Sequence, residues 1–449
     1  MSESSKLGIE FGQHVMQMTQ ELLLGQPGSL SDMERRIREM LMRLGQFLMA
    51  AWIMLQEGPY PAQHIPCSCG KEAGYVCKRE AVLLTVLGKV SYKRAYYLCP
   101  HCHTGMCPLD RQLGLRPGEL SAELESLSGM VGASMPFGSG SKLFETLTLL
   151  PISPQSIDRA TQDMGAEMAH VEQEWIKASE DGLALHAQEC APKDGRRLYG
   201  ALDATKVHTR EHQGPEDQGW RDLKVGVWFE STAPPPESPQ EGWVIKATNT
   251  TYFCDITEAR QFGTLLWATG FQRKALQASE LIFLGDGAEW IWNLVRDNYP
   301  HAVQIVDWFH AAEHLGTVAK AAIRDASTRE LWFERVRGFL WEGQVSEVIQ
   351  ACQELLSEGH GQEEIRQAVG YFTNNAARMD YGTYRRKGYQ IGSGTIESAC
   401  KQLGIQRMKV PGANWNREGA RLTAKARAAL LSDQWEVLTA RREYLPRVA

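Results

Sequence analysis

The sequence predicts an α/β protein built on a five-stranded mixed β-sheet. Five apolar, strand-like runs follow one another in the middle of the chain, at 198–203, 223–230, 247–254, 281–285 and 302–306. The first three are joined without a good helix, whereas helical segments precede the fourth and the fifth. Short connections favour antiparallel neighbours and helical crossovers favour parallel ones, so we expect a sheet with both kinds of pairing.

The first 58 residues are predicted to be helical. Segment 30–55 has apolar residues at helical spacing. We assign Ser31 as its N-cap because Glu34 follows three residues later, in the pattern of a capping box. We interpret this segment as a scaffold or oligomerisation helix.

Residues 59–118 carry two short cysteine pairs on either side of a predicted β-hairpin. The pairs are a C-x-C and a C-x-x-C pattern, formed by Cys67, Cys69, Cys99 and Cys102. Tetrahedral Zn²⁺ takes four thiolates from two such turns, so the pattern predicts a zinc ribbon with one structural Zn²⁺. Buried free thiols are the alternative. Spare candidate ligands nearby are Cys77, Cys107, His101 and His103.

Residues 119–195 are again predicted to be helical. One helix is expected to end near Leu150, and Ser153 and Pro154 open the next as its N-cap and first residue. Two short helices joined by a short turn are typical of a helix-turn-helix, whose second helix would present Arg159 to DNA. A helical hairpin packed against the neighbouring domain is the alternative.

Three acidic residues stand where a metal-dependent nuclease or strand transferase needs them. Asp203 ends the first strand-like run, Asp286 follows the fourth, and Glu397 lies at the start of a predicted helix. A buried carboxylate is costly without a partner, and two divalent metal ions would supply one for in-line phosphoryl transfer. Taken singly, the two aspartates are also explained as turn or N-cap residues, and Glu397 as part of a solvated helix face.

Four longer motifs surround these acids: LDATKVH at 202–208, FLGDGAEWIW at 283–292, VDWFHAAEHL at 306–315, and RMDYGTYRRKGYQIGSGTIESACKQLGIQRMKVPGANW at 378–415. With them, the chain from 198 to 443 resembles the DDE transposases of bacterial insertion sequences, in the Mutator-like superfamily and its Kra-type branch. The resemblance covers a little over half of the sequence. It implies an RNase H-like fold at 196–310, completed by final helices and a basic C-terminal segment at 386–449.

The resemblance also implies the roles of individual residues. Asp203, Asp286 and Glu397 would form the catalytic triad. In our interpretation they hold two Mg²⁺ or Mn²⁺ ions, with Asp203 bridging both. Asp307 and His310 would be the accessory D-x-x-H pair. A helical insertion would separate the second and third acids, and we assign residues 311–385 to it. The partners would be double-stranded DNA, both the terminal inverted repeats of the element and target DNA.

The segment from Arg385 to Arg427 holds ten basic residues and two acidic ones. We interpret it as a phosphate-binding surface beside Glu397, because affinity for DNA depends on local basic density. A solvated helix face is the alternative. The basic residues are Arg385, Arg386, Lys387, Lys401, Arg407, Lys409, Arg417, Arg421, Lys425 and Arg427.

Composition limits the class of protein without identifying it. The 449 residues carry a formal net charge of −6, so contact with DNA must rely on local patches. Apolar runs fall short of the roughly 20 residues that span a bilayer, and the N-terminus lacks a signal-peptide pattern. We therefore expect a cytoplasmic, nucleoid-associated protein without membrane contact, whose cysteines are metal ligands or buried thiols.

The sequence thus predicts a transposase that binds the ends of its insertion sequence and catalyses metal-dependent strand cleavage and transfer, as a homodimer or higher oligomer on DNA. Two alternatives remain. One is a non-catalytic DNA-binding regulator derived from a transposase, and the other is a stand-alone RNase H-like nuclease. The role of His310 stays open between a structural histidine and one that positions DNA.

Overall fold

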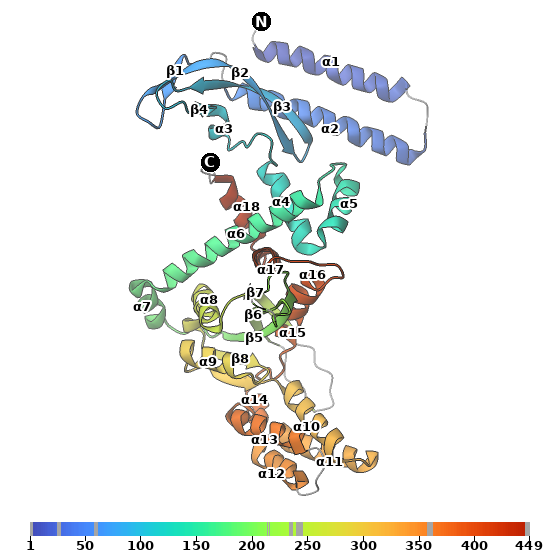
Figure 1. Ribbon diagram of the computed structural model, residues 1–449, viewed down its shortest axis with the longest axis vertical. Helices are drawn as coiled ribbons and strands as arrows, with labels where there is room; N and C mark the ends of the chain where they lie inside the picture. Colours follow the sequence, from blue (N-terminus) through green and yellow to red (C-terminus); the bar gives the residue numbers. More distant parts are fainter. Residues whose placement is uncertain are drawn as a thin grey trace. The chain divides into compact units, whose positions relative to one another are not determined.

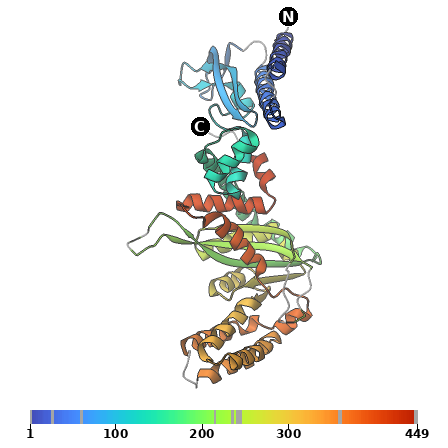
Figure 2. The same cartoon turned by 90° about the vertical axis from the view of Figure 1, so that its right-hand side faces the viewer.

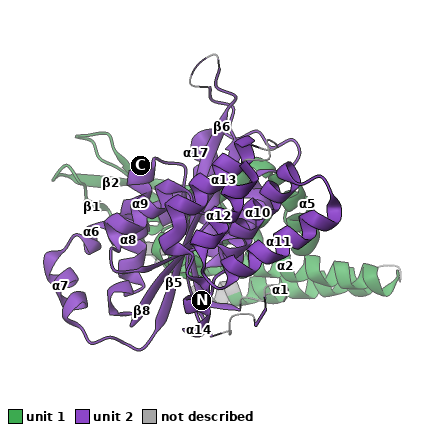
Figure 3. Cartoon of the chain, turned by 90° about the horizontal axis from the view of Figure 1, so that it is seen from below, with its two compact units in different colours: residues 1–164, 435–449 green, residues 165–434 purple. Residues whose placement is uncertain are grey.

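The computed structural model describes residues 3–24, 28–57, 62–212, 214, 216–232, 237–238, 246–356 and 362–444 (Figure 1). The chain divides into two compact units (Figure 3). Unit 1 comprises Met1–Met164 and Trp435–Ala449, and unit 2 comprises Gly165–Gln434. The finer six-part division expected from the sequence stays a prediction. No helix in the described part of the chain has both the length and the apolar character needed to cross a membrane.

Unit 1 begins with a hairpin of two helices, α1 (Glu3–Leu24) and α2 (Leu30–Leu55). The N-cap of α2 is Ser29, whose Oγ accepts the amide of Asp32 at 3.2 Å while its own amide donates to Asp32 Oδ2 at 3.0 Å. The prediction of Ser31 as N-cap was therefore wrong. Ser29 has the extended backbone of an N-cap, and Asp32 completes the capping box with it.

A four-stranded antiparallel sheet follows, with strand order β1-β2-β3-β4. Its strands are β1 (His64–Pro66), β2 (Glu72–Thr85), β3 (Gly88–Leu98) and β4 (Gly105–Met106). One side of the β2–β3 hairpin packs its apolar side chains, including Leu83 and Tyr92, against Ile53 of α2. The hairpin predicted between the two cysteine pairs is therefore confirmed.

The rest of unit 1 is helical. Its helices are α3 (Pro108–Gln112), α4 (Ala122–Ser134), α5 (Phe137–Thr148), the first part of α6 (Pro154–Ser179), and α18 (Trp435–Tyr444). Ser153 caps α6 as predicted, because its Oγ accepts the amide of Ser156 at 3.1 Å. The expectation of two short helices was wrong for the second one. Helix α6 has 26 residues, since buried apolar residues such as Met164 and Met168 continue along it at helical spacing.

Unit 2 is built on a five-stranded sheet of order β7-β6-β5-β8-β9. Its strands are β5 (Arg197–His208), β6 (Trp220–Ser231), β7 (Ala247–Asp255), β8 (Glu280–Gly285) and β9 (Val303–Val306). Strands β5, β6 and β7 pair antiparallel, whereas β8 pairs parallel with both β5 and β9. The predicted mixed sheet is confirmed. Asp203, however, lies inside β5 and not at its end, because β5 stays paired with β6 as far as His208.

Helices of unit 2 cover this sheet and extend from it (Figures 1 and 2). Those before β9 are the second part of α6, α7 (Gly182–Cys190), α8 (Ala259–Gln272) and α9 (Glu289–Asn298), with a short 3₁₀ turn η1 (Ala275–Gln277). The segment after β9 is helical as predicted: α10 (Trp308–Ala322), α11 (Ala326–Trp341), α12 (Val345–Leu356), α13 (Gln362–Asn375), η2 (Ala376–Arg378) and α14 (Tyr381–Arg386).

The chain then returns to the sheet. It forms α15 (Gly394–Cys400), a π-helical turn η3 (Lys401–Ile405), α16 (Gln406–Met408) and α17 (Arg417–Leu431). Helix α15 packs against β5 and β6, and α17 packs against β7. The return therefore brings Glu397, on α15, to the strand that carries Asp203.

Candidate active site and candidate zinc site

The register of the parallel strands brings three aspartates to one edge of the sheet. Ala201 of β5 pairs with Leu284 of β8, so the register continues to Asp203 and Asp286, each two residues further on. Gly285 of β8 pairs with Val306 of β9, so Asp286 is followed across the sheet by Asp307. Neighbouring strands lie roughly 4.8 Å apart, and residues in register point to the same face. The three carboxylates therefore form a row.

Asp307 is fully buried and connects the starts of two helices, α10 and α15. Asp307 is the N-cap of α10, and its Oδ1 accepts the backbone amide of His310 at 2.6 Å. The ring Nδ1 of His310 lies 3.2 Å from Oδ1 of Asp307. Oδ2 of Asp307 accepts the amide of Ser393, the N-cap of α15. Because Ser393 starts the helix that carries Glu397, Asp307 fixes where that glutamate enters the site.

The ligand atoms of Asp307, His310 and Glu397 all lie within 4.8 Å of one another. The hydrogen bond with Asp307 is the main reason that the pKa of His310 rises to about 9. The charges of Asp307, Asp286 and Glu397 raise this pKa further, while burial opposes them. The neighbouring carboxylates thus favour the protonated form of this ring, which donates hydrogen bonds.

Asp203 is held from two sides. Its Oδ1 accepts the amide of Ala204 at 2.7 Å, and its Oδ2 accepts the thiol of Cys400 at 3.3 Å. Burial raises the pKa of Asp203 above its usual range. The charge of Asp286 raises this pKa further, whereas the two hydrogen bonds lower it. Burial also raises the pKa of Cys400 far above its usual value, so its sulfur stays protonated and acts as a donor.

Asp286 lies on a tight turn between β8 and α9. Its Oδ1 accepts the amide of Ala288 at 2.9 Å, and its carbonyl oxygen accepts the hydroxyl of Tyr371 at 3.0 Å. Gly287 has a φ of +102°, a conformation that favours glycine. The ring of Tyr371 stacks on that of His314 with centroids 3.9 Å apart. Helix α13, which carries Tyr371, thus supports the turn that carries Asp286.

The structure brings five predicted site residues to one region: Asp203, Asp286, Asp307, His310 and Glu397. Among the described residues, Asp307, His310 and Glu397 have ligand atoms within 4.8 Å of one another, whereas Asp203 and Asp286 lie outside this group. The assignment of the catalytic triad stays a prediction. Sequence reasoning missed the supporting residues Ser393, Cys400 and Tyr371. Only Cys400 had a visible signal, because it follows Glu397 by three residues and so shares its side of a helix.

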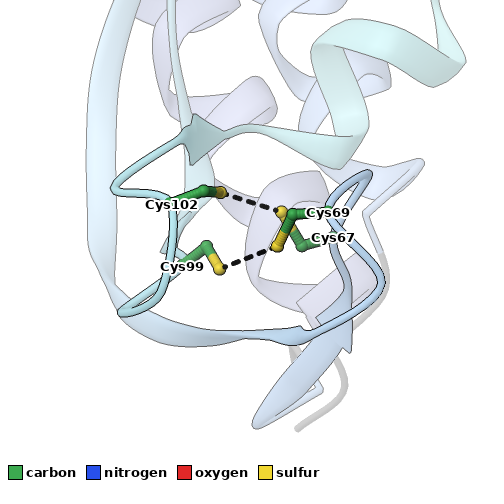
Figure 4. Close-up of side chains that lie close together, drawn as sticks. All are labelled: Cys67, Cys69, Cys99 and Cys102. Carbon is green, nitrogen blue, oxygen red and sulfur yellow. Dashed lines mark hydrogen bonds between the residues drawn. The ribbon is translucent and has the colours of Figure 1, made fainter.

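The four predicted zinc ligands meet in unit 1 (Figure 4). The sulfurs of Cys67 and Cys102 lie 3.5 Å apart, and those of Cys69 and Cys99 lie 3.6 Å apart. Thiolates about 2.3 Å from a tetrahedral zinc ion are about 3.8 Å from one another, so the donor set fits this metal. The spare candidates Cys77, Cys107, His101 and His103 lie outside the group of four.

Both cysteine pairs lie on tight turns whose backbone supports the site. The amide of Cys67 donates to the carbonyl of Lys71 at 2.8 Å, and the amide of Cys99 donates to that of Thr104 at 3.0 Å. The C-x-C pair, although one residue shorter than usual, still brings both of its sulfurs into the group.

The basic segment 385–427 does not form one continuous surface. Five of its ten basic residues are exposed, namely Arg386, Lys387, Lys401, Lys409 and Arg417, and Arg159 on α6 is exposed as well. Arg385 stacks on Trp341 and pairs with Glu342, and Arg421 pairs with Glu418 and Asp255.

Three further basic residues of the segment, Arg407, Lys425 and Arg427, are buried. The prediction that Arg407 contacts phosphates is therefore corrected, since its side chain is 1% exposed and its guanidinium lies over the ring of Trp415. Lys425 is also 1% exposed and pairs with Glu172 and Asp255. Charge counting cannot separate solvated basic residues from those that neutralise buried acids.

Comparison with known proteins leaves the family open. No protein-family model matches the chain, and no curated protein matches it. Five solved chains match, among them one described as a Drosophila P element transposase strand transfer complex. That chain is 10% identical, with 74% of this chain and 83% of the other covered, at a TM-score of 0.24. At this TM-score the likeness carries no argument, and the expected Mutator-like and Kra-type assignment is not shown.

We expect the purified protein to contain about one zinc per chain. Replacing Cys69 by Ser should abolish zinc binding, because a tetrahedral site loses one of its four thiolates. Replacing Cys107 by Ser is the matched control and should leave the zinc content unchanged, since Cys107 lies outside the group. Elemental analysis of protein prepared without chelator measures this. A zinc-free wild-type protein, or equal loss in both variants, would contradict the assignment.

Proposed function

We propose that this chain is a DNA transposase of the DDE type, which binds the ends of its element and catalyses metal-dependent strand cleavage and strand transfer. One observation carries the proposal: the strand register aligns Asp203 of β5 with Asp286 and Asp307, which directly follow β8 and β9, and α15 brings Glu397 within 4.8 Å of Asp307. The sequence motifs that resemble DDE transposases surround these same acids. Two independent lines of argument therefore meet at one site.

The donor set fits a hard divalent cation. Asp203, Asp286 and Glu397 offer carboxylate oxygens, which Mg²⁺ and Mn²⁺ prefer. Asp307 accepts hydrogen bonds from His310 and Ser393, at the starts of α10 and α15, so we assign it to positioning these two helices. A pair of such ions, when bound, lowers the pKa of an attacking water or 3′-hydroxyl and stabilises the leaving oxygen.

The protein's own part is to hold the three carboxylates in place. Asp203 is fixed within a central strand, Asp286 by a glycine turn, and Glu397 by the first turn of α15. Asp307 sets the position of that helix through Ser393. Nδ1 of His310 lies 3.2 Å from Asp307 Oδ1, so this ring helps to hold that carboxylate beside Glu397.

The same proposal assigns DNA contacts to exposed basic residues. Lys401 and Lys409 follow Glu397 and would contact phosphates near the cut site. Arg386 is a further exposed candidate. Arg159, exposed on α6, would contribute to recognition of the element ends.

A transposase-derived regulator would bind DNA without cutting it, and a stand-alone nuclease would cut without joining. Assays of cleavage and of joining therefore separate these two alternatives from the proposed transposase.

We expect Asp203→Asn, Asp286→Asn and Glu397→Gln each to reduce Mg²⁺-dependent cleavage of end DNA by about 100-fold or more. An amide keeps the shape of the acid but ligates divalent ions poorly, and even partners outside the first ligand shell contribute about 10–100-fold. Asp297→Asn, on the exposed side of α9, is the matched control and should cleave normally. Cleavage is measured on labelled end fragments, and a variant that retains it loses its place in the triad.

Binding of the same DNA, measured without cleavage, separates the loss of catalysis from the loss of DNA contacts. The three amide variants should bind with near wild-type affinity, because their change is confined to the carboxylates. Joint replacement of Lys401 and Lys409 by Ala should weaken binding and reduce the slope of log K against log salt by about 0.9 for each phosphate that the variant no longer neutralises. Lys177→Ala, exposed on α6, should change neither. An unaltered slope in the lysine pair would place the DNA elsewhere.

We further propose that α1 and α2 hold copies of the chain together. Apolar side chains recur on each helix at seven-residue spacing and are exposed: Ile9, Met16 and Leu23 on α1, and Leu41, Leu48 and Leu55 on α2. Such spacing is typical of a helix that packs along another helix. Because each copy carries both stripes, two-fold association of two hairpins would bury them together.

We expect the wild-type protein to be a dimer or larger in solution. Joint replacement of Leu41 and Leu48 by Glu should yield monomers, since charged residues at these positions oppose apolar packing. Leu331→Glu is the matched control, because Leu331 on α11 is 74% exposed and lies outside the stripes. Sedimentation or light scattering gives the mass. A monomeric wild type, or a double variant that stays associated, would contradict the proposal.

A further inference from the structure

The thiol of Cys400 lies inside the carboxylate site, in a position that the proposed chemistry does not use. Its sulfur donates to Asp203 Oδ2 at 3.3 Å. Cys400 follows Glu397 by three residues on α15, so both side chains lie on the same side of the helix. One short helix therefore supplies a proposed metal ligand and also a hydrogen-bond donor to a second proposed ligand on another element.

The backbone around Cys400 brings this helix close to β5. The π-helical turn η3 starts immediately after it, with Cys400 as N-cap. Such turns are rare and occur frequently at functional sites. A Cβ atom on Gly404 in this turn would lie 2.5 Å from Cγ2 of Thr205, so glycine permits the close approach. Because Thr205 is two residues after Asp203, this packing holds the thiol next to the carboxylate.

The contact fixes the one oxygen of Asp203 that its own strand does not fix. Oδ1 is already held by the amide of Ala204, whereas Oδ2 accepts the thiol. A thiol is a weak, uncharged donor. It orients the carboxylate without the positive charge of a lysine or an arginine, which would compete with a metal cation for the same oxygen.

We propose that Cys400 is a positioning residue that orients Asp203 for divalent-metal binding. The inference rests on the proposed function, because it assumes that Asp203 is a metal ligand. Removing the donor should weaken metal binding at the site. A replacement that keeps a donor at the same atom should restore it.

Mn²⁺ binding to the full chain tests this, measured by calorimetry or by electron paramagnetic resonance. Cys400→Ala should weaken binding about tenfold, at the lower end of the range for partners of metal ligands, because a thiol is a weak donor. Cys400→Ser should retain most of the affinity. Cys352→Ala is the matched control, because Cys352 is fully buried in α12 and lies outside the group of potential ligands around Glu397. At saturating Mn²⁺ the cleavage rate of Cys400→Ala should approach that of the wild type.

The outcomes separate this inference from the proposed function. If Asp203→Asn abolishes Mn²⁺ binding but Cys400→Ala binds as the wild type does, the positioning role is overturned and the proposed function stands. Equal weakening by Cys400→Ala and Cys400→Ser, or by Cys352→Ala, would also overturn it, because packing would then explain the loss. If Asp203→Asn binds Mn²⁺ normally, the proposed function itself fails.

Discussion

The buried carboxylate of Asp307 is the group on which the candidate active site depends. It closes the first turn of α10 through His310 and the start of α15 through Ser393. Between these two points the chain leaves the sheet, forms the helices from α10 to α14 and returns, so the position of Glu397 depends on how the return is fixed. Hydrogen bonds to a charged acceptor contribute about 1.5–3 kcal/mol each, and a buried carboxylate without them would be costly. Asp307 is therefore a structural clamp beside the acids that we assign to metal binding.

The topology of the sheet explains why those acids meet. In the antiparallel half, β6 runs opposite to β5 and β7, so it ends on the other side of the sheet. In the parallel half, β5, β8 and β9 run in the same direction and their registers place Asp203, Asp286 and Asp307 in one row. Parallel strands thus gather residues that are far apart in the sequence, and α15 supplies the fourth carboxylate from outside the sheet.

Much of the fold could be predicted from the sequence because the signals were local. Strand-like runs and connection types gave the five strands and their directions, and cysteine spacing gave the group of four thiols. Features that depend on distant partners could not be predicted. Lys425 belongs to a basic run but is buried against Glu172, 253 residues earlier in the chain. The hydrogen bond from the Cys400 thiol to Asp203 could not be predicted, because it depends on the packing of α15 against β5.

The central claim is that a divalent cation binds Asp203, Asp286 and Glu397, while Asp307 and His310 support the site without touching the metal. A crystal structure of the protein soaked in Mn²⁺, with anomalous scattering recorded to locate the metal, tests this most directly. The account predicts anomalous peaks bonded to oxygens of those three carboxylates, with the hydrogen bonds of Asp307 to His310 and Ser393 intact. A peak bonded to a ring nitrogen of His310 and to Asp307 would contradict it.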